Sequence, residues 1–176
     1  MPEATTVRER RFVREATPAE RLRSALSRFA TGVCVVTLRV EGAPHGLTVN
    51  SFTSVSLEPP LVLVSVGKQT RGHAHLAGRP FAVNVLGAEQ QAVALHFAGR
   101  PQEGVVRWVD GARAPRLEGA LAYFECEPWA AYEGGDHTLF VGRVEEHDCR
   151  PGEALGYYRS RFLFIEEESL GIEYVL

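Results

Sequence analysis

Three short segments of the sequence carry polar side chains in patterns that suit ligand binding. The first is Gly46-Leu47-Thr48-Val49-Asn50-Ser51-Phe52, in which hydroxyl and amide groups are interleaved with apolar side chains. A flat ring with one apolar edge and one hydrogen-bonding edge, such as a flavin, requires this combination. The alternative is an exposed strand whose polar residues face water, and this segment alone leaves both open.

A second segment, Lys68-Gln69-Thr70-Arg71, follows an apolar run at Leu61–Val66 and precedes a predicted short helix at Arg71–Ala77. Cationic side chains and the free N–H groups at a helix start bind phosphate through charge-assisted hydrogen bonds. The glycine spacing of a Walker motif is absent from the segment. A phosphate site and an ordinary solvated basic loop both fit this pattern.

The third segment, Glu133-Gly134-Gly135-Asp136-His137-Thr138, joins paired glycines to an acid and an imidazole. Glycine permits close approach of a ligand, and Asp136 could orient or charge the ring of His137. A Ser-His-Asp hydrolase is excluded, because the chain has no Gly-x-Ser-x-Gly motif. A zinc site would need more ligands, since His73 and His75 are two residues apart and do not share a helix face. The alternative is a hairpin turn with an incidental histidine.

The bulk composition excludes several classes of protein. Hydrophobic residues make up 45% of the 176 residues, which is enough for a single-domain core without disulfides. The formal net charge of −3 is too small and too mixed for a nucleic-acid-binding surface. No apolar run approaches the roughly 20 residues of a membrane-spanning helix, and no secretory signal is recognisable. We therefore expect a cytoplasmic protein that binds neither nucleic acid nor a membrane.

The cysteines and the N-terminal segment define the expected organisation of the chain. Cys34, Cys126 and Cys149 are widely spaced and form no metal-binding motif, so we predict three reduced thiols without a catalytic role. Residues 1–16 alternate in charge and have little apolar content, which predicts a flexible N-terminal tail. Residues 17–176 are then expected to form a single domain.

The elements that must position these segments are mostly strands. Thr17-Pro18-Ala19-Glu20 is a capping box, and the apolar residues after it predict a helix that ends at Thr31-Gly32. A second helix is predicted at Ala88–Ala98 and a long loop at Gly99–Pro115. Strands are predicted at Val33–Val40, Gly46–Ser56, Leu61–Val66, Phe81–Leu86, Ala120–Trp129, Thr138–His147 and Tyr157–Ile165. Because the helices do not alternate with the strands, we predict a mainly β fold, an antiparallel barrel with a few peripheral helices.

Taken in order, several segments resemble the short-chain flavin reductase family, the reductase components of two-component flavin-dependent monooxygenases. The segments are Thr31–Thr37, Gly46–Val62, Phe81–Leu86, Leu117–Ala122 and Gly135–Val144, and the resemblance spans about residues 20–165. It implies an FMN-binding split β-barrel, a homodimer, and hydride transfer from NADH or NADPH to FMN or FAD. Reduced flavin would then diffuse to a separate partner monooxygenase.

By matched position, the resemblance also implies a set of site residues. Those expected along the isoalloxazine ring are Thr48, Val49, Asn50 and Ser51. Those expected near the ribityl chain and phosphate are Ser65, Val66, Lys68, Thr70 and Arg71. Phe97 and Arg100 are expected near the flavin tail, and Tyr158 and Arg161 are further cofactor-binding candidates. His137 is expected on the nicotinamide side as the candidate catalytic residue.

Hydride transfer needs no protein nucleophile, so the protein supplies position and electrostatics. The nicotinamide C4 must come within roughly 3–3.5 Å of the flavin N5, and we expect His137 to position the nucleotide rather than transfer a proton. The backbone around Asn50–Phe52 is expected to donate hydrogen bonds near N1, where reduction leaves negative charge. Two alternatives stay open: a flavin oxidase of the pyridoxamine-phosphate-oxidase type, and a non-enzymatic flavin- or haem-binding split barrel.

Overall fold

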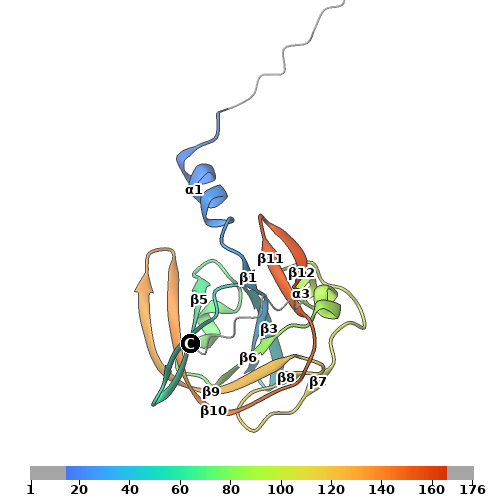
Figure 1. Cartoon of the computed structure of the whole chain (residues 1–176). Coiled ribbons are helices and arrows are strands. Elements are labelled where there is room, and N and C mark those ends of the chain that lie inside the picture. Colours follow the sequence, from blue (N-terminus) through green and yellow to red (C-terminus); the bar gives the residue numbers. More distant parts are fainter. Residues whose placement is uncertain (1–14, 166–176) are drawn as a thin grey trace, which may run out of the picture.

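The computed structural model describes residues 15–165, and its main element is a seven-stranded antiparallel sheet that curls into a barrel (Figure 1). The strand order is β3-β2-β6-β9-β10-β5-β4. The bounds are β2 Cys34–Val40, β3 Ala43–Val49, β4 Thr53–Leu57, β5 Pro60–Gly67, β6 Phe81–Val85, β9 Ala122–Gly134 and β10 His137–Cys149. The predicted mainly β, antiparallel fold is confirmed. The tail predicted over residues 1–16 lies almost wholly outside the described residues.

Smaller elements surround this barrel. The short strands are β1 Thr31–Gly32, β7 Trp108–Val109, β8 Arg116–Leu117, β11 Ala154–Tyr158 and β12 Arg161–Ile165. The helices are α1 Pro18–Leu26, α2 His73–Leu76, the 3₁₀ helix η1 Ala88–Gln90, and α3 Gln91–Phe97. They form a β1-β11-β12 sheet, a β7-β8 pair and the peripheral helices. Across residues 15–165, none of the helices has the length and apolar character to cross a membrane.

The predicted capping box of α1 is confirmed, but the helix is shorter than predicted. The Thr17 hydroxyl accepts a hydrogen bond from the Glu20 N–H at 3.2 Å, and the Glu20 carboxylate accepts one from the Thr17 N–H at 2.7 Å. The helix ends at Leu26, where the sequence predicted that it would continue to Thr31-Gly32. The Ser27 hydroxyl bonds to the Ser24 carbonyl at 2.8 Å, and such local side-chain bonds compete with helical ones.

The strand predicted at Gly46–Ser56 is wrong, because the structure divides it into β3 and β4. These two strands are the opposite edges of the seven-stranded sheet, and residues 50–52 connect them. The Ser51 hydroxyl causes the break: it donates to the Ser65 carbonyl at 2.7 Å and accepts from the Ser65 N–H at 3.0 Å. These two bonds attach the segment 50–52 to β5, so the chain leaves the β3 edge of the sheet at this point.

The single strand predicted at Tyr157–Ile165 is also wrong, since this region is the β11–β12 hairpin. Its turn is Arg159-Ser160, and both residues have positive φ, at 50° and 60°. Two-residue hairpin turns of this kind favour Asn-Gly or Asp-Gly. The sequence therefore offered no turn signal at this position.

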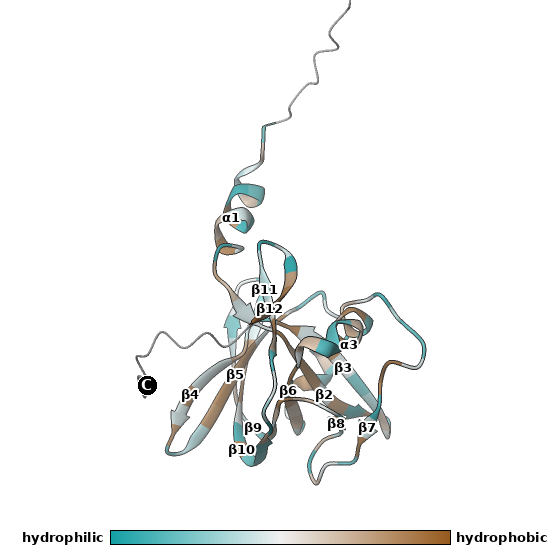
Figure 2. Cartoon of the chain, turned by 45° about the vertical axis from the view of Figure 1, so that its right-hand side comes forward, coloured by the Kyte–Doolittle hydropathy of each residue, from teal (hydrophilic) through white to brown (hydrophobic). Residues whose placement is uncertain are grey.

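Two apolar clusters form the core, and β2 contributes to both. Figure 2 colours the ribbon by hydropathy, and the strands of the barrel include long hydrophobic stretches. The cluster inside the barrel consists of Cys34, Val36, Leu38, Val40, Leu47, Val62, Val64, Val66, Leu76, Phe81, Val83, Cys126 and Phe140. The cluster beneath α3 consists of Val33, Val35, Leu86, Val93, Ala94, Leu117 and Leu155. Successive strand residues point to opposite faces of a sheet, so the unbroken burial from Cys34 to Leu38 shows that both faces of β2 are covered.

The three cysteines are free, as predicted, and they differ in burial. Burial raises the pKa of the Cys34 and Cys126 thiols to about 12, whereas Cys149 is exposed. Only a thiolate reacts readily with disulfide reagents. We therefore expect native protein at pH 8 to release one equivalent of chromophore promptly from such a reagent, and three after denaturation. Cys149→Ser should abolish the prompt reaction, and a second fast thiol would contradict the prediction.

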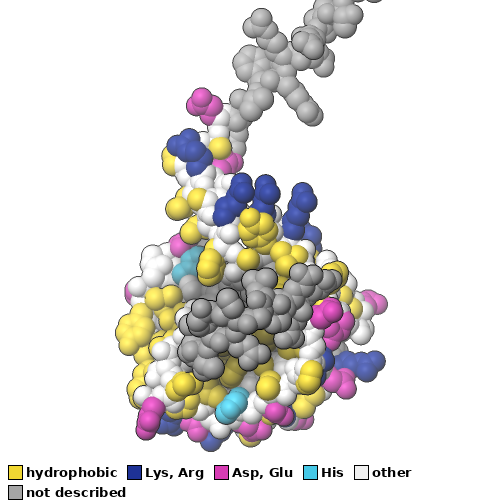
Figure 3. All heavy atoms as spheres, in the orientation of Figure 1, with side chains coloured by type: hydrophobic (Ala, Val, Ile, Leu, Met, Phe, Trp, Pro, Cys, Tyr) yellow, Lys and Arg dark blue, Asp and Glu magenta, His cyan; other side chains and the backbone are white. Residues whose placement is uncertain are grey.

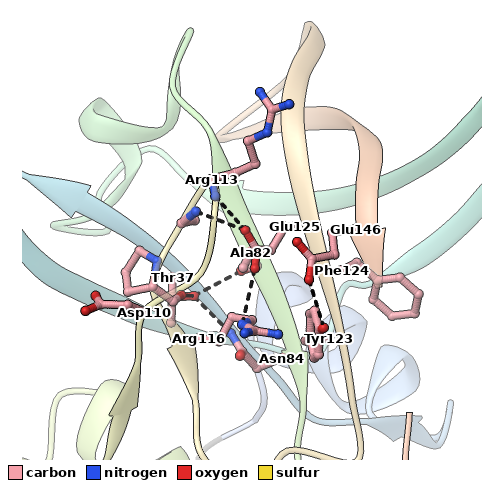
Figure 4. A network of polar contacts seen from close by, with 12 residues as sticks. Thr37, Ala82, Asn84, Asp110, Arg113, Arg116, Tyr123, Phe124, Glu125 and Glu146 are labelled. Atoms are coloured by element: carbon pink, nitrogen blue, oxygen red, sulfur yellow. Dashed lines mark hydrogen bonds and ion pairs between the residues drawn. The ribbon is translucent and has the colours of Figure 1, made fainter. Parts of the chain in front are cut away.

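A buried polar network joins the barrel to the loop between α3 and β9 (Figure 4). At its centre is Glu125 of β9, which is 0% exposed. Its carboxylate accepts hydrogen bonds from the backbone N–H groups of Arg113, at 2.6 Å, and Ala114, at 3.4 Å. The Arg116 Nε lies 3.2 Å from the other carboxylate oxygen but out of hydrogen-bond alignment, so this contact is electrostatic. The loop is thus fixed by a buried charge.

The neighbouring strands extend the network along one row of the sheet. Thr37 of β2 donates from its hydroxyl to the Pro115 carbonyl at 2.5 Å. Asn84 of β6 donates to the Thr37 hydroxyl at 2.9 Å and accepts from the Leu117 N–H at 2.8 Å. Buried polar groups are stabilising only when they are paired in this way. Because these residues alternate along their strands with Val36, Val83 and Cys126 of the interior cluster, the network lies on the outer face of the sheet, beneath the loop.

Candidate functional site

A cavity of about 260 Å³ lies where the end of β3 approaches the end of β5. Its lining residues are Leu47, Thr48, Val49, Asn50, Ser51, Ser65, Val66, Gly67, Thr70 and His137. The structure therefore brings together the four residues predicted along the isoalloxazine ring with four others from the predicted set. Leu47 and Gly67 were not among the predicted residues. Gly67 has no signal in the sequence, because it reaches the site by pairing with His137 across the β5–β10 ladder.

Two of the lining hydroxyls hold the cavity walls in place. The Thr48 hydroxyl donates to the Ala94 carbonyl of α3 at 2.7 Å, and the Ser51 hydroxyl bridges to Ser65 of β5. These hydroxyls therefore fix β3 to α3 on one side and residues 50–52 to β5 on the other. Asn50 and Ser51 line the cavity and lie outside the strands, so strand pairing does not use their backbone polar groups.

The His137 ring lies at the entrance and is oriented by its neighbour. Its Nδ1 is 2.8 Å from the Asp136 carboxylate, and the side chain is 47% exposed. A carboxylate only accepts hydrogen bonds, so Nδ1 carries a proton and Nε2 is the acceptor in the neutral ring. The hydrogen bond from His137 and its charge lower the pKa of the Asp136 carboxyl. A Cβ built at Gly67 would lie 3.6 Å from Nε2, so this nitrogen faces the cavity.

The turn that carries His137 is bound to the end of β5. The Lys68 N–H donates to the Asp136 carbonyl at 2.9 Å, and the Lys68 ammonium forms an ion pair with Glu133. The hydrogen bond from Lys68 and its charge lower the pKa of the Glu133 carboxyl. Lys68 therefore braces the β9–β10 turn, and it is not among the residues that line the cavity.

Five other predicted residues lie outside the lining: Arg71, Phe97, Arg100, Tyr158 and Arg161. Phe97 of α3 packs behind β3, where its ring would meet a Cβ at Gly46 at 2.6 Å, and it contacts Trp108 edge-on at 5.7 Å. Arg71 and Arg100 are exposed. Tyr158 and Arg161 flank the turn of the β11–β12 hairpin.

The chemistry of the lining fits a flavin ring. Val49 and Val66 supply apolar contacts, and Asn50, Thr70 and the backbone of Asn50 and Ser51 supply hydrogen-bonding groups. Ligand pockets have this mixture of apolar walls and a few polar groups. The volume is just below the roughly 300–1,000 Å³ of pockets that enclose a whole ligand, which suits the ring end of a larger molecule.

Comparisons with known proteins agree with this geometry. The family model described as "Flavin reductase like domain" matches residues 26–166. The NADH-dependent flavin reductase of a Rhodococcus species is 43% identical over 157 residues, covering 86% of this chain and 89% of that protein. The reductase component of 4-hydroxyphenylacetate 3-monooxygenase from Thermus thermophilus is 42% identical over 142 residues, covering 80% and 92%.

A solved structure gives the same result for the fold. The NADH:FAD oxidoreductase of Streptomyces globisporus, in complex with NAD and FAD fragments, superposes with a TM-score of 0.80. The two chains are 42% identical, and the match covers 89% of this chain and 99% of that one.

Proposed function

The chain belongs to the flavin reductase-like family, and we propose from that premise that it is an NADH-dependent flavin reductase. It transfers a hydride from NADH to FMN or FAD and releases reduced flavin to a flavin-dependent monooxygenase. The observation that carries the proposal is the cavity that joins the polar end of β3 to His137 at the start of β10. The named activity of the Rhodococcus and Thermus relatives supports the choice of NADH and of a monooxygenase partner.

The residues of the cavity orient the two substrates. A bound flavin supplies the hydride acceptor, its N5. Val49 and Val66 would exclude water from the ring, and the unpaired backbone at Asn50 and Ser51 would supply hydrogen bonds to its polar edge. The His137 Nε2 accepts a hydrogen bond from the nicotinamide carboxamide, because Asp136 holds the proton on the other ring nitrogen.

His137→Ala is expected to raise the KM for NADH about three- to tenfold with little change in kcat. The reason is the loss of one hydrogen bond of roughly 1 kcal/mol that positions the nucleotide. Steady-state rates at saturating flavin give both constants. His147→Ala, in the same strand but outside the cavity lining, is the control. An unchanged KM for NADH would remove His137 from the nucleotide site.

The proposed function is tested by oxidation of NADH or NADPH, followed at 340 nm with FMN or FAD in each combination. We expect a flavin-dependent rate with NADH, and a faster one than with NADPH. The absence of a flavin-dependent rate with either nucleotide would contradict a reductase. A flavin oxidase of the pyridoxamine-phosphate-oxidase type would instead retain yellow flavin on purification and turn over without nucleotide. A non-enzymatic barrel would bind flavin without turnover.

We infer that the protein is a homodimer, on the basis of α1. Leu22, Leu26 and Phe29 recur at the spacing of one helix face and are 61%, 66% and 78% exposed. No residue of α1 is buried, and a helix of nine residues is too short to be stable alone in water. Its apolar face therefore needs a surface that residues 15–165 of the same chain do not supply.

A second copy supplies that surface. Leu61, Leu63 and Leu139 on the outer side of β5 and β10 are half-buried, and Leu57 of β4 is 93% exposed. We expect sedimentation of a dimer at micromolar concentration and of a monomer for Leu26→Glu. A monomeric wild type would contradict the inference.

The three free thiols suit the reducing cytoplasm, where we place this reaction.

A further inference from the structure

A second cavity, of about 350 Å³, lies between α1 and the turn of the β11–β12 hairpin. Its lining includes Glu20, Arg23, Ser27, Arg28, Arg159 and Ser160. Figure 3 shows basic side chains gathered at this place, over the hairpin and the base of α1. Within residues 15–165, none of the three arginines forms an ion pair with a carboxylate. The cavity is therefore lined by cations that the described part of the chain does not neutralise.

The orientation of α1 is the reverse of the usual one. Glu20, Arg23 and Ser27 face the cavity, whereas Leu22 and Leu26 lie on the opposite side of the helix and are exposed. A surface helix normally turns its apolar stripe toward its own core. Here the helix presents a charged wall to its own hairpin, and apolar packing among residues 15–165 does not account for that arrangement.

The opposite wall is a strained turn. Arg159 and Ser160 both adopt left-handed backbone conformations, which side chains other than Gly, Asn and Asp rarely adopt. Strain of this kind persists where the surrounding structure or a function requires the residue. The Arg159 N–H donates to the Ser27 carbonyl at 2.8 Å, so the turn is bound directly to the end of α1. These two strained residues are the part of the hairpin that lines the cavity.

The charge and the donors of this cavity suit a phosphate ligand. Three guanidinium groups and one carboxylate leave a net charge of two positive charges, and the Glu20 carboxylate is itself bonded to the Thr17 N–H. Arginine binds phosphate oxygens through paired hydrogen bonds. A pyrophosphate diester carries two negative charges, which match the surplus.

The position of the cavity indicates which molecule would carry the bound phosphate. In Figure 1, α1 and the β11–β12 hairpin lie at the same end of the barrel as the β9–β10 turn that carries His137. We propose that the cavity of Arg23, Arg28 and Arg159 binds the pyrophosphate of a dinucleotide whose ring occupies the cavity at Thr48–Ser51. This inference rests on the proposed function. The dinucleotide that carries the pyrophosphate is either FAD or NADH.

The test compares the double variant Arg28→Ala/Arg159→Asn with wild type, using FAD, FMN, NADH and reduced nicotinamide mononucleotide. Asparagine keeps the left-handed turn and removes the guanidinium. We expect at least a tenfold higher KM for one dinucleotide, with no change for its mononucleotide. A change for FAD but not FMN identifies the flavin, and a change for NADH but not its mononucleotide identifies the nicotinamide nucleotide.

Arg21→Ala is the matched control, because Arg21 is on α1 and bonds to the Ala16 carbonyl outside the cavity. Equal KM values in the double variant and in Arg21→Ala would overturn the inference, as would an equal rise for all four substrates. Calorimetry with inorganic pyrophosphate gives a readout independent of turnover. Wild type should bind pyrophosphate and the double variant at least tenfold more weakly; a wild type that does not bind it overturns the inference even if the enzyme reduces flavin.

Discussion

Gly67→Val is expected to lower kcat/KM for flavin at least about 100-fold without destabilising the protein. A Cβ at Gly67 would lie 3.4 Å from the Thr70 hydroxyl and 3.6 Å from the His137 Nε2, so the added side chain enters the cavity between two of its lining residues. Displacement of a bound reactant by about 1 Å can cost 100-fold in rate. The 340 nm assay over a range of flavin concentrations measures the loss.

Stability separates this effect from misfolding. Gly67 is in a strand and does not have positive φ, so valine fits its backbone conformation. Thermal unfolding should occur at the wild-type temperature or above it. Gly32→Val is the matched control, because Gly32 is also a strand glycine and a Cβ there meets no atom within 4 Å. Near-normal flavin turnover in Gly67→Val would show that the ring binds elsewhere.

Glu125→Gln is expected to lower the free energy of unfolding by about 3 kcal/mol. Removal of one partner from a buried ion pair typically costs about 3–5 kcal/mol, because the other charge stays buried without compensation. Glu125 is 0% exposed, the Arg116 side chain is 19% exposed, and the Arg116 guanidinium also lies 4.0 Å above the Tyr123 ring. Urea denaturation measures the change. A loss of this size is a large share of the 5–15 kcal/mol that stabilises a typical domain.

Asp110→Asn is the control for Glu125→Gln, since Asp110 is in the same loop and its ion pair with Arg39 is exposed. Exposed pairs contribute about 0–1 kcal/mol, so this variant should unfold close to wild type. An equal effect of the two substitutions would contradict the assigned role of burial. Because Glu125 does not line either cavity, kcat/KM for the folded Glu125→Gln protein should stay near the wild-type value.

The local sequence determined the elements with strong short-range signals. The capping box at Thr17–Glu20 and the strand at Leu61–Val66 follow from neighbouring residues, and the structure has both where they were predicted. The segment Glu133–Thr138, for which a hairpin turn was one of two alternatives, does join two paired strands. The errors occurred where long-range contacts override local patterns. The bonds from Ser51 to Ser65 divide a continuous strand pattern, and Arg159-Ser160 forms a turn without turn residues.

The sequence by itself determined the family, the mainly β fold and the residues at the end of β3, because these depend on residue types in a fixed order. Only the tertiary structure decided which of those residues meet. Gly67 reaches His137 through the β5–β10 register, and Arg159 reaches Ser27 through a hairpin that folds back on α1. Strand register and helix orientation are set by the burial of side chains far apart in the chain, and no short segment contains that information.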